Sequence, residues 1–123
     1  MQGKKLVQKI LAACSDKQGK ETICLDLRRF NALANYFILT SGTSERQVSA
    51  IANHVVSTLR DEKTKPYRVE GLNESRWVLV DYSDVIVHVF HQETRQFYNL
   101  ERLWGDAPRI SDSQEEEENE GKS

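Results

Sequence analysis

The sequence predicts a single α/β domain in which a five-stranded mixed β-sheet is flanked by helices. Three observations predict this class. Apolar residues recur at helical spacing within residues 6–14 and 48–59, β-branched and aromatic residues fill residues 77–82 and 85–90, and helix-like segments alternate with strand-like ones. At 123 residues, the chain is long enough to bury a core without disulfides or metal ions.

The first half of the chain predicts two helices and two strands. The first helix has an apolar stripe on one face, formed by Leu6, Val7, Ile10, Leu11 and Cys14. Residues 22–27 alternate between polar and apolar side chains, as a strand with one buried face does. Residues 36–40 are almost continuously apolar and therefore predict a central strand. The second helix has a stripe formed by Val48, Ile51, Val55 and Leu59.

The second helix begins with a capping signal. Ser44 and Gln47 have the spacing of a capping box, in which the two side chains satisfy free backbone N–H groups at a helix start. Such donors can also hold a phosphate, so residues 41–44 are an alternative anion site. The segment lacks a P-loop lysine and the G-x-G-x-x-G spacing, and a capped helix explains the same residues.

A β-hairpin follows a short strand at residues 67–70. Its strands are residues 77–82 and 85–90, and Ser83-Asp84 between them is a two-residue turn. One face is then wholly apolar and is expected to meet the core; its cross-strand pairs are Tyr82 with Val85, Val80 with Val87, and Val78 with Val89. The other face is mixed; its pairs are Trp77 with Phe90, Leu79 with His88, and Asp81 with Ile86. This mixed face suits either a second packing layer or a partner.

The last predicted element is a helix over residues 94–104, which ends before Gly105 and Pro108. Its core-facing side chains are predicted to be Phe97, Leu100, Leu103 and Trp104. The opposite side presents an exposed ridge of Arg95, Tyr98 and either Glu101 or Arg102. A tyrosine between charges can anchor a partner, although a partly buried tyrosine with a solvated hydroxyl is the commoner case.

Charge divides the chain into two parts. The net charge is −2, and residues 111–123 hold six acidic residues and one lysine. That segment therefore carries −5, and residues 1–110 carry +3. Because nothing apolar follows Ile110, residues 111–123 are expected to be a disordered acidic tail behind a domain of residues 1–110.

The cysteines predict a cytoplasmic setting. Cys14 and Cys24 match neither a disulfide framework nor a zinc-ligand spacing, so reduced thiols are the simplest interpretation. No segment has the length of a membrane span. The lysines and apolar residues before Cys14 have some likeness to a lipoprotein signal, but Gln8 and Lys9 interrupt the apolar run, and a helix fits better.

No arrangement of catalytic or metal-binding side chains stands out. Asp81 and Asp84 flank the hairpin turn and are better explained by turn capping than by a shared cation. His88 and His91 would point to opposite faces of a strand, so a shared metal is not expected. There is neither a nucleophile motif nor a basic stripe with interleaved aromatics. These residues predict no enzyme, no metal, no cofactor and no nucleic acid as the main contact.

Five segments together carry a resemblance to a known family. They are residues 35–39 (NYFIL), 42–48 (GTSERQV), 69–71 (VEG), 77–90 (WVLVDYSDVIVHVF) and 95–104 (RQFYNLERLW). In this order they closely resemble the ribosomal silencing factor family RsfS, also called Iojap, over residues 4–108. The combination of D-x-x-D-V-x-V-H with R-x-F-Y-x-L-E-x-L-W is specific.

The resemblance implies a mixed α/β domain that is related in fold to nucleotidyltransferases but has no known catalysis. It implies a partner, ribosomal protein uL14 on the intersubunit face of the large ribosomal subunit. A protein bound there keeps the small subunit from joining, so that translation is repressed under nutrient limitation or in stationary phase. The alternatives are a nucleotidyltransferase-like enzyme that binds nucleotide through Gly42 and Thr43, and direct RNA binding. A weak homodimer is left open.

Eight residues are the expected partner contacts: Trp77, Leu79, Asp81, Asp84 and His88 on the hairpin, and Arg95, Tyr98 and Glu101 on the following helix. The tryptophan and tyrosine would anchor the interface, and the acids would meet basic side chains. Packing beneath a helix is the alternative for Trp77. Two positions depart from the family pattern: Asn35 stands where aspartate is common, and Ser83 where glycine is common. Serine tolerates a positive φ less well than glycine.

Overall fold

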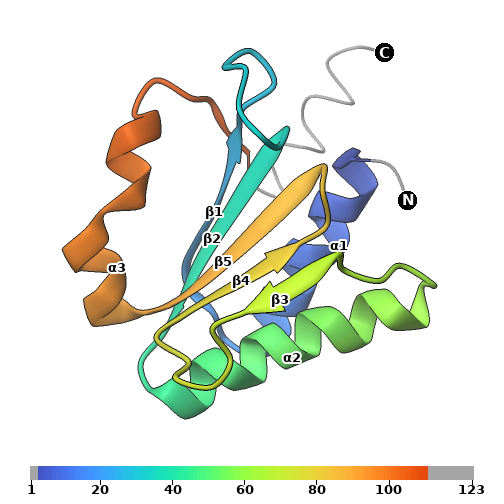
Figure 1. Cartoon of the computed structure of the whole chain (residues 1–123), viewed down its shortest axis with the longest axis vertical. Coiled ribbons are helices and arrows are strands. Elements are labelled where there is room, and N and C mark those ends of the chain that lie inside the picture. Colours follow the sequence, from blue (N-terminus) through green and yellow to red (C-terminus); the bar gives the residue numbers. More distant parts are fainter. Residues whose placement is uncertain (1–2, 111–123) are drawn as a thin grey trace.

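The computed structural model of the chain describes residues 3–110 (Figure 1). The elements in this range are α1 (Gly3–Asp16), β1 (Lys20–Asp26), β2 (Tyr36–Gly42), α2 (Glu45–Asp61), β3 (Arg68–Glu70), β4 (Trp77–Asp81), β5 (Val85–His91), α3 (Gln92–Tyr98), the 3-10 helix η1 (Leu100–Trp104) and β6 (Arg109–Ile110). They build one domain around one mixed sheet, which confirms the predicted α/β class.

The described part of the sheet has six strands, in the order β3-β4-β5-β2-β1-β6, rather than the five predicted. β2 and β5 are parallel at the centre, and the other neighbouring strands are antiparallel. The strand missing from the prediction is β6, in which Ile110 lies opposite Cys24 of β1. A strand of two residues has no periodicity to detect.

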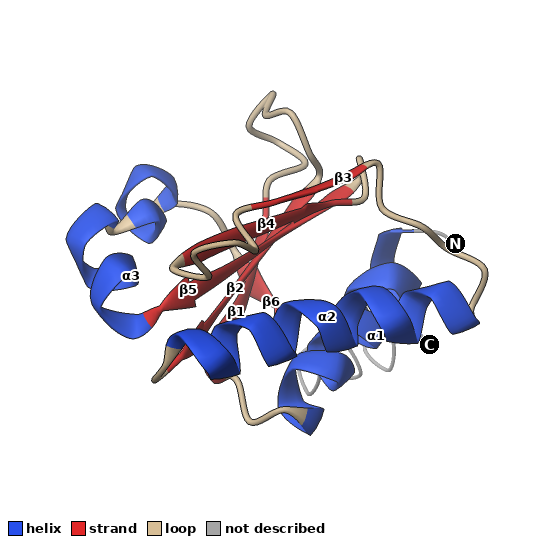
Figure 2. Ribbon diagram, turned by 60° about the horizontal axis from the view of Figure 1, so that its bottom comes forward, coloured by secondary structure: helices blue, strands red, loops and turns tan. Residues whose placement is uncertain are grey.

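α1 and α2 lie together on one face of the sheet (Figure 2). The predicted apolar stripes of both helices are buried there, against the apolar face of the hairpin. Cys14 and Cys24 both belong to this core, and burial raises the pKa of Cys14 to about 12. The Cys14 thiol therefore stays protonated at neutral pH.

Ser44 caps α2 as predicted, since its Oγ accepts a hydrogen bond from the N–H of Gln47 at 3.1 Å. The Gln47 side chain reaches one residue further back than in a capping box, and its Oε1 accepts from the N–H of Thr43 at 2.7 Å. Its Nε2 donates to the carbonyls of Lys17 and Gln18, just after α1. The Thr43 and Gln47 donors are thus used within the protein, which favours the helix cap over a phosphate site.

β4 and β5 form the predicted hairpin in the predicted register. The turn is tight, because the N–H of Asp84 donates to the carbonyl of Tyr82 at 2.9 Å. Ser83 between them has a φ of 72°, a conformation that glycine adopts without strain. Oδ1 of Asp81 accepts from the N–H of Ser83 at 2.7 Å, so this carboxylate caps the turn as predicted.

The segment after β5 differs from the single helix predicted over residues 94–104. α3 ends at Tyr98, and Asn99 adopts a left-handed conformation with a φ of 48° before η1 begins. Because of this break, side chains before and after Asn99 no longer share the face that one continuous helix would give them. The core positions predicted for Phe97 and Leu103 are therefore wrong. These two residues are 80% and 73% exposed rather than in the core.

The second face of the sheet has a smaller core beneath η1. Leu100 and Trp104 are partly buried there, and the Trp104 ring packs edge-on against Phe30 and Phe37.

Within residues 3–110, no helix has both the length and the apolar character needed to cross a membrane. The predicted acidic tail, residues 111–123, lies outside the described residues.

Candidate functional site

The second face of the sheet is covered only in part. α3 and η1 pack over β5, β2 and β1, whereas β3 and β4 at the sheet edge keep a surface open to solvent (Figure 2). The side chains of Arg68 and Glu70 are more than half exposed there, and Leu79 and Asp81 are partly exposed. This open surface is part of the mixed face predicted for the hairpin.

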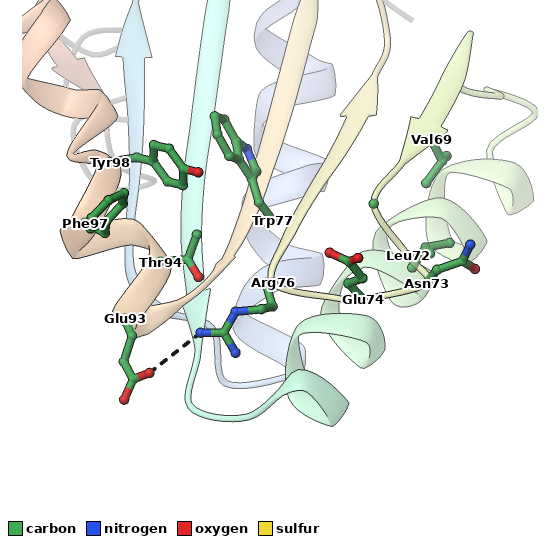
Figure 3. A pocket seen from close by; sticks show the side chains of 11 residues that line it. Val69, Leu72, Asn73, Glu74, Arg76, Trp77, Glu93, Thr94, Phe97 and Tyr98 are labelled. Carbon is green, nitrogen blue, oxygen red and sulfur yellow. Dashed lines mark ion pairs between the residues drawn. The ribbon is translucent and has the colours of Figure 1, made fainter.

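A groove of about 850 Å³ lies between the open surface and α3 (Figure 3). Its walls are the loop after β3 (residues 71–74), the start of β4 and one side of α3. Three aromatic rings line it, and the ring centre of Tyr98 lies 5.1 Å from that of Trp77 and 5.0 Å from that of Phe97. Phe97 is largely exposed and Tyr98 is 56% exposed. Neighbouring aromatic rings left in solvent mark a binding surface, and we call this site the aromatic groove.

Charged side chains surround the aromatic groove. Arg76 forms ion pairs with Glu93 at 3.6 Å and with Glu45 at 3.2 Å, and all three side chains are largely exposed. Exposed ion pairs contribute little to stability, so Arg76 can exchange these partners for groups on a bound protein. Glu74 adds a carboxylate from the facing loop (Figure 3). An apolar centre with a charged rim is the usual anatomy of a protein interface.

Trp77 lines the inner wall of the aromatic groove and is held by His88. The indole N–H donates to Nδ1 of His88 at 3.1 Å. His88 is 4% exposed, and burial lowers its pKa to about 4, so the ring is neutral at neutral pH. Since Nδ1 accepts, the proton of the neutral ring is on Nε2, which has no hydrogen-bond partner within residues 3–110. His88 therefore supports the groove from beneath rather than meeting solvent.

Arg95 and Glu101 fasten α3 and η1 to the sheet. Nε and Nη2 of Arg95 lie 3.1 Å from Oε2 of Glu101, and Nη1 donates to Oγ of Ser41 at 2.9 Å. Arg95 is 7% exposed, so the exposed position predicted for it is wrong. The left-handed Asn99 explains this result, because it turns Glu101 back towards Arg95. The pair holds the segment that carries Tyr98.

The two hairpin aspartates lie away from the aromatic groove, towards the other end of β4. Asp81 accepts a hydrogen bond from Nε of Arg68 at 3.2 Å, and Asp84 accepts one from the side chain of Asn35. Among residues 3–110, no group of three or more histidine, cysteine or acidic side chains could hold a metal ion.

A second hollow, of about 400 Å³, lies at that end of the open surface. Leu33 and Tyr67 line it and are largely exposed, beside Ile86 on β5. The sequence did not single out either side chain. Leu33 lies in a loop, where no periodicity separates exposed from buried apolar residues, and Tyr67 was placed in the strand predicted over residues 67–70, whereas β3 begins at Arg68.

The family model described as "Ribosomal silencing factor during starvation" (RsfS) matches residues 1–123. The chain belongs to the RsfS family.

Relatives agree with this assignment. The chain is 43% identical over 108 residues to the ribosomal silencing factor RsfS of Bacillus subtilis, an alignment that covers 88% of this chain and 92% of that protein. It is 36% identical over 73 residues to a mouse protein named mitochondrial assembly of ribosomal large subunit protein 1, covering 57% of this chain and 32% of the mouse protein. The RsfS name is that of a regulatory factor rather than an enzyme, as predicted.

Solved structures share the fold. A crystal structure from Chromobacterium violaceum has a TM-score of 0.83 at 36% identity and covers 85% of this chain and 88% of that one. A crystal structure from Bacillus halodurans has a TM-score of 0.79 at 36% identity, with coverages of 88% and 98%. The mixed sheet flanked by helices is therefore shared with these two solved structures.

The structure divides the predicted RsfS contact residues into three groups. Trp77 and Tyr98 meet in the aromatic groove, and Leu79 continues from it along the open surface. The supporting residues, behind or beneath this surface, are His88, Arg95 and Glu101. The hairpin-turn residues, at the far end of β4, are Asp81 and Asp84. Sequence reasoning missed Phe97 as a groove residue because it assigned that side chain to the core.

Proposed function

We propose that this chain binds the large ribosomal subunit through ribosomal protein uL14 and thereby keeps the small subunit from joining. The observation that carries the proposal is the aromatic groove, an apolar and solvent-exposed site on a domain whose family is described as a ribosomal silencing factor during starvation. The name of the mouse relative, which refers to the ribosomal large subunit, supports the choice of subunit.

The aromatic groove has the chemistry of a protein contact. Trp and Tyr are the side chains that most often dominate interface energies, and Trp77, Phe97 and Tyr98 provide three rings in one place. Leu79 extends the apolar area, while Glu74 and Glu93 favour basic groups on the partner. A standard interface takes about 800 Å² from each partner, so we propose that the contact extends from the groove over the open surface.

Repression by this route needs no chemical step. A folded domain of 14.2 kDa bound on a joining surface excludes the second subunit by its volume. The proposed setting is the cytoplasm when nutrients are scarce or growth has stopped, where fewer joined ribosomes would lower translation. The proposed direct contacts are Trp77, Leu79, Phe97 and Tyr98, and His88, Arg95 and Glu101 maintain their arrangement. Asp81 and Asp84 are proposed as contacts at the outer limit of the interface.

Co-migration on a sucrose gradient tests the proposal with a matched pair of variants. Phe97 and Leu103 are both exposed apolar residues on the segment after β5, but only Phe97 lines the aromatic groove. The parent and Leu103→Ala should migrate with isolated large subunits and reduce joining when small subunits are added. Phe97→Ala should bind at least about tenfold more weakly, as expected for an interface aromatic residue.

Two results would contradict the proposal. Absence of the parent from large-subunit fractions would remove the proposed partner. Equal loss of binding by Phe97→Ala and Leu103→Ala would remove the aromatic groove as the contact site. Cross-linking of a photoreactive group at Phe97 should yield uL14, and a different ribosomal protein in that position would replace uL14 as the partner.

A further inference from the structure

His88 differs from the other buried polar side chains of the described chain. Thr40, Ser41, Ser75 and Arg95 are each bonded to backbone or side-chain groups that hold the fold together. The hydrogen bond of His88 goes to Trp77, a partly exposed residue of the aromatic groove. Its other ring nitrogen, Nε2, is buried and has no partner within residues 3–110.

An apolar residue would satisfy the packing around His88 equally well. The His88 ring lies between aromatic neighbours, with its centre 4.7 Å from that of Phe37 and 6.1 Å from that of Phe90. A phenylalanine would fill this space and would avoid the buried N–H at Nε2, whose lack of a partner carries a desolvation cost. The property that histidine adds here is an acceptor at Nδ1, aimed at the indole N–H of Trp77.

The hydrogen bond fixes the orientation of the indole. The Trp77 ring also packs at 4.9 Å on Phe90 and at 5.1 Å on Tyr98, but ring contacts at angles of 32° and 46° permit rotation and sliding. A directional bond at 3.1 Å removes that freedom. A partner that meets a fixed ring loses less conformational entropy on binding than one that must order the ring.

We propose that His88 is a positioning residue for binding, which acts through Trp77 by holding its indole in the orientation that forms the wall of the aromatic groove. This inference rests on the proposed function, because it takes the aromatic groove as the contact site for the large ribosomal subunit. It differs from a direct contact role, which the burial of His88 excludes in this conformation.

Three variants separate the hydrogen bond from the packing. His88→Phe keeps an aromatic ring and removes the acceptor. His88→Asn loses the ring and keeps an acceptor oxygen close to the place of Nδ1. His54→Phe is the matched control, because His54 bonds to Asp16 where α1 and α2 meet, on the opposite face of the sheet.

The free protein gives the first measurement. The chain has two tryptophans, so an indole ¹⁵N–¹H spectrum has two signals, and Trp104 serves as an internal reference. We expect the Trp77 signal of His88→Phe to shift and to exchange with solvent faster, while the Trp104 signal stays in place. His88→Asn should restore slow exchange. A Trp77 signal unchanged in His88→Phe would overturn the inference whatever the ribosome does.

Binding of the full-length protein to isolated large subunits gives the second measurement. His88→Phe should weaken binding about tenfold, near the upper range for one hydrogen bond, His88→Asn should recover most of the loss, and His54→Phe should match the parent. Trp77→Phe removes the same bond from the donor side, so its effect should not add to that of His88→Phe.

Additive losses, or equal binding by His88→Phe and the parent, would overturn the inference while the proposed function stands. A parent protein that does not bind large subunits would overturn the proposed function, and the inference with it.

Discussion

Tyr98 and Phe97 are exposed at the end of a short helix, yet each ring touches another aromatic ring. The Tyr98 ring connects the buried side of the aromatic groove, at Trp77, with its outer side, at Phe97. His88 completes this chain of contacts from below, through the indole of Trp77. Single side chains therefore have separable roles here: Phe97 and Tyr98 are exposed to a partner, whereas His88 supports them through Trp77.

The pKa of His88 predicts a specific loss of stability in mild acid. Burial lowers the folded-state pKa from 6.5 to about 4, so between these values the unfolded chain takes up the proton and the folded chain does not. Above pH 6.5, His88 is neutral in both states and folding loses nothing by keeping it neutral. As the pH falls from 6.5 towards 4, proton uptake favours the unfolded chain, and the free energy of unfolding decreases. From about pH 7 to about pH 5, the free energy of unfolding should fall by about 2 kcal/mol more in the parent than in His88→Phe. Urea unfolding at both pH values measures this, and parallel losses in the two proteins would refute the assignment.

Ser83 predicts a stabilising substitution. Its φ of 72° is strained for a residue with a Cβ atom, and the turn allows little adjustment because Asp84 bonds back to Tyr82. Ser83→Gly should raise the free energy of unfolding by about 1 kcal/mol, after allowance for the greater freedom of glycine in the unfolded chain. Ser83→Ala keeps the Cβ atom and should give no gain. Thermal unfolding of the three proteins would settle the matter, and a lower melting temperature for Ser83→Gly would count against strain at this turn.

At the scale of elements, sequence patterns succeeded where local chemistry and periodicity agreed. The hairpin register follows from alternation on both sides of a two-residue turn, so the pairing and the two faces were predictable, and Trp77 with them. The segment after β5 was predictable only in part, because the left-handed Asn99 divides it. Asparagine is a known but weak signal for a left-handed helix end, and the apolar spacing that runs through residues 97–104 favours one continuous helix. The same break exposes Phe97 and buries Arg95, so the groove lining and its support were beyond periodicity.

The Arg95–Glu101 pair predicts how the segment after β5 can be loosened. Arg95→Met leaves the Glu101 carboxylate largely buried without its cation, which should lower the free energy of unfolding by about 3 kcal/mol. Replacing both residues with methionine should recover most of that loss, because an apolar pair needs no compensation for buried charge. Hydrogen exchange of residues 92–104 should accelerate in Arg95→Met more than exchange in α2. Equal stability of the single variant and the parent would show that the pair does not hold this segment.

For the molecule as a whole, the distribution of charge matters more than its sum. Residues 111–123 carry −5 against +3 for the remainder, so their removal turns an acidic protein into a basic one. At physiological salt, deletion of residues 111–123 should leave large-subunit affinity within a few-fold, because the aromatic groove lies within residues 3–110. At low salt, the shortened protein should bind ribosomal RNA more strongly, since a basic surface gains from phosphate contacts. A loss of affinity of about a hundredfold at physiological salt, or about 2.7 kcal/mol, would instead place contacts in the deleted residues.

The central pairing of β2 with β5 also sets the order in which the chain can assemble. Tyr36 lies opposite Val85, 49 positions later, and β6 returns from residue 110 to pair with β1 at Cys24. Pairings between such distant residues form slowly, because the intervening chain must close a long loop first. During synthesis, β2 has to wait for β5 to emerge, and β1 has to wait for almost the whole described domain. We therefore expect the edges of β1 and β2 that pair with β6 and β5 to spend the longest time without their final neighbours, which makes these strands the segment most in need of protection by chaperones.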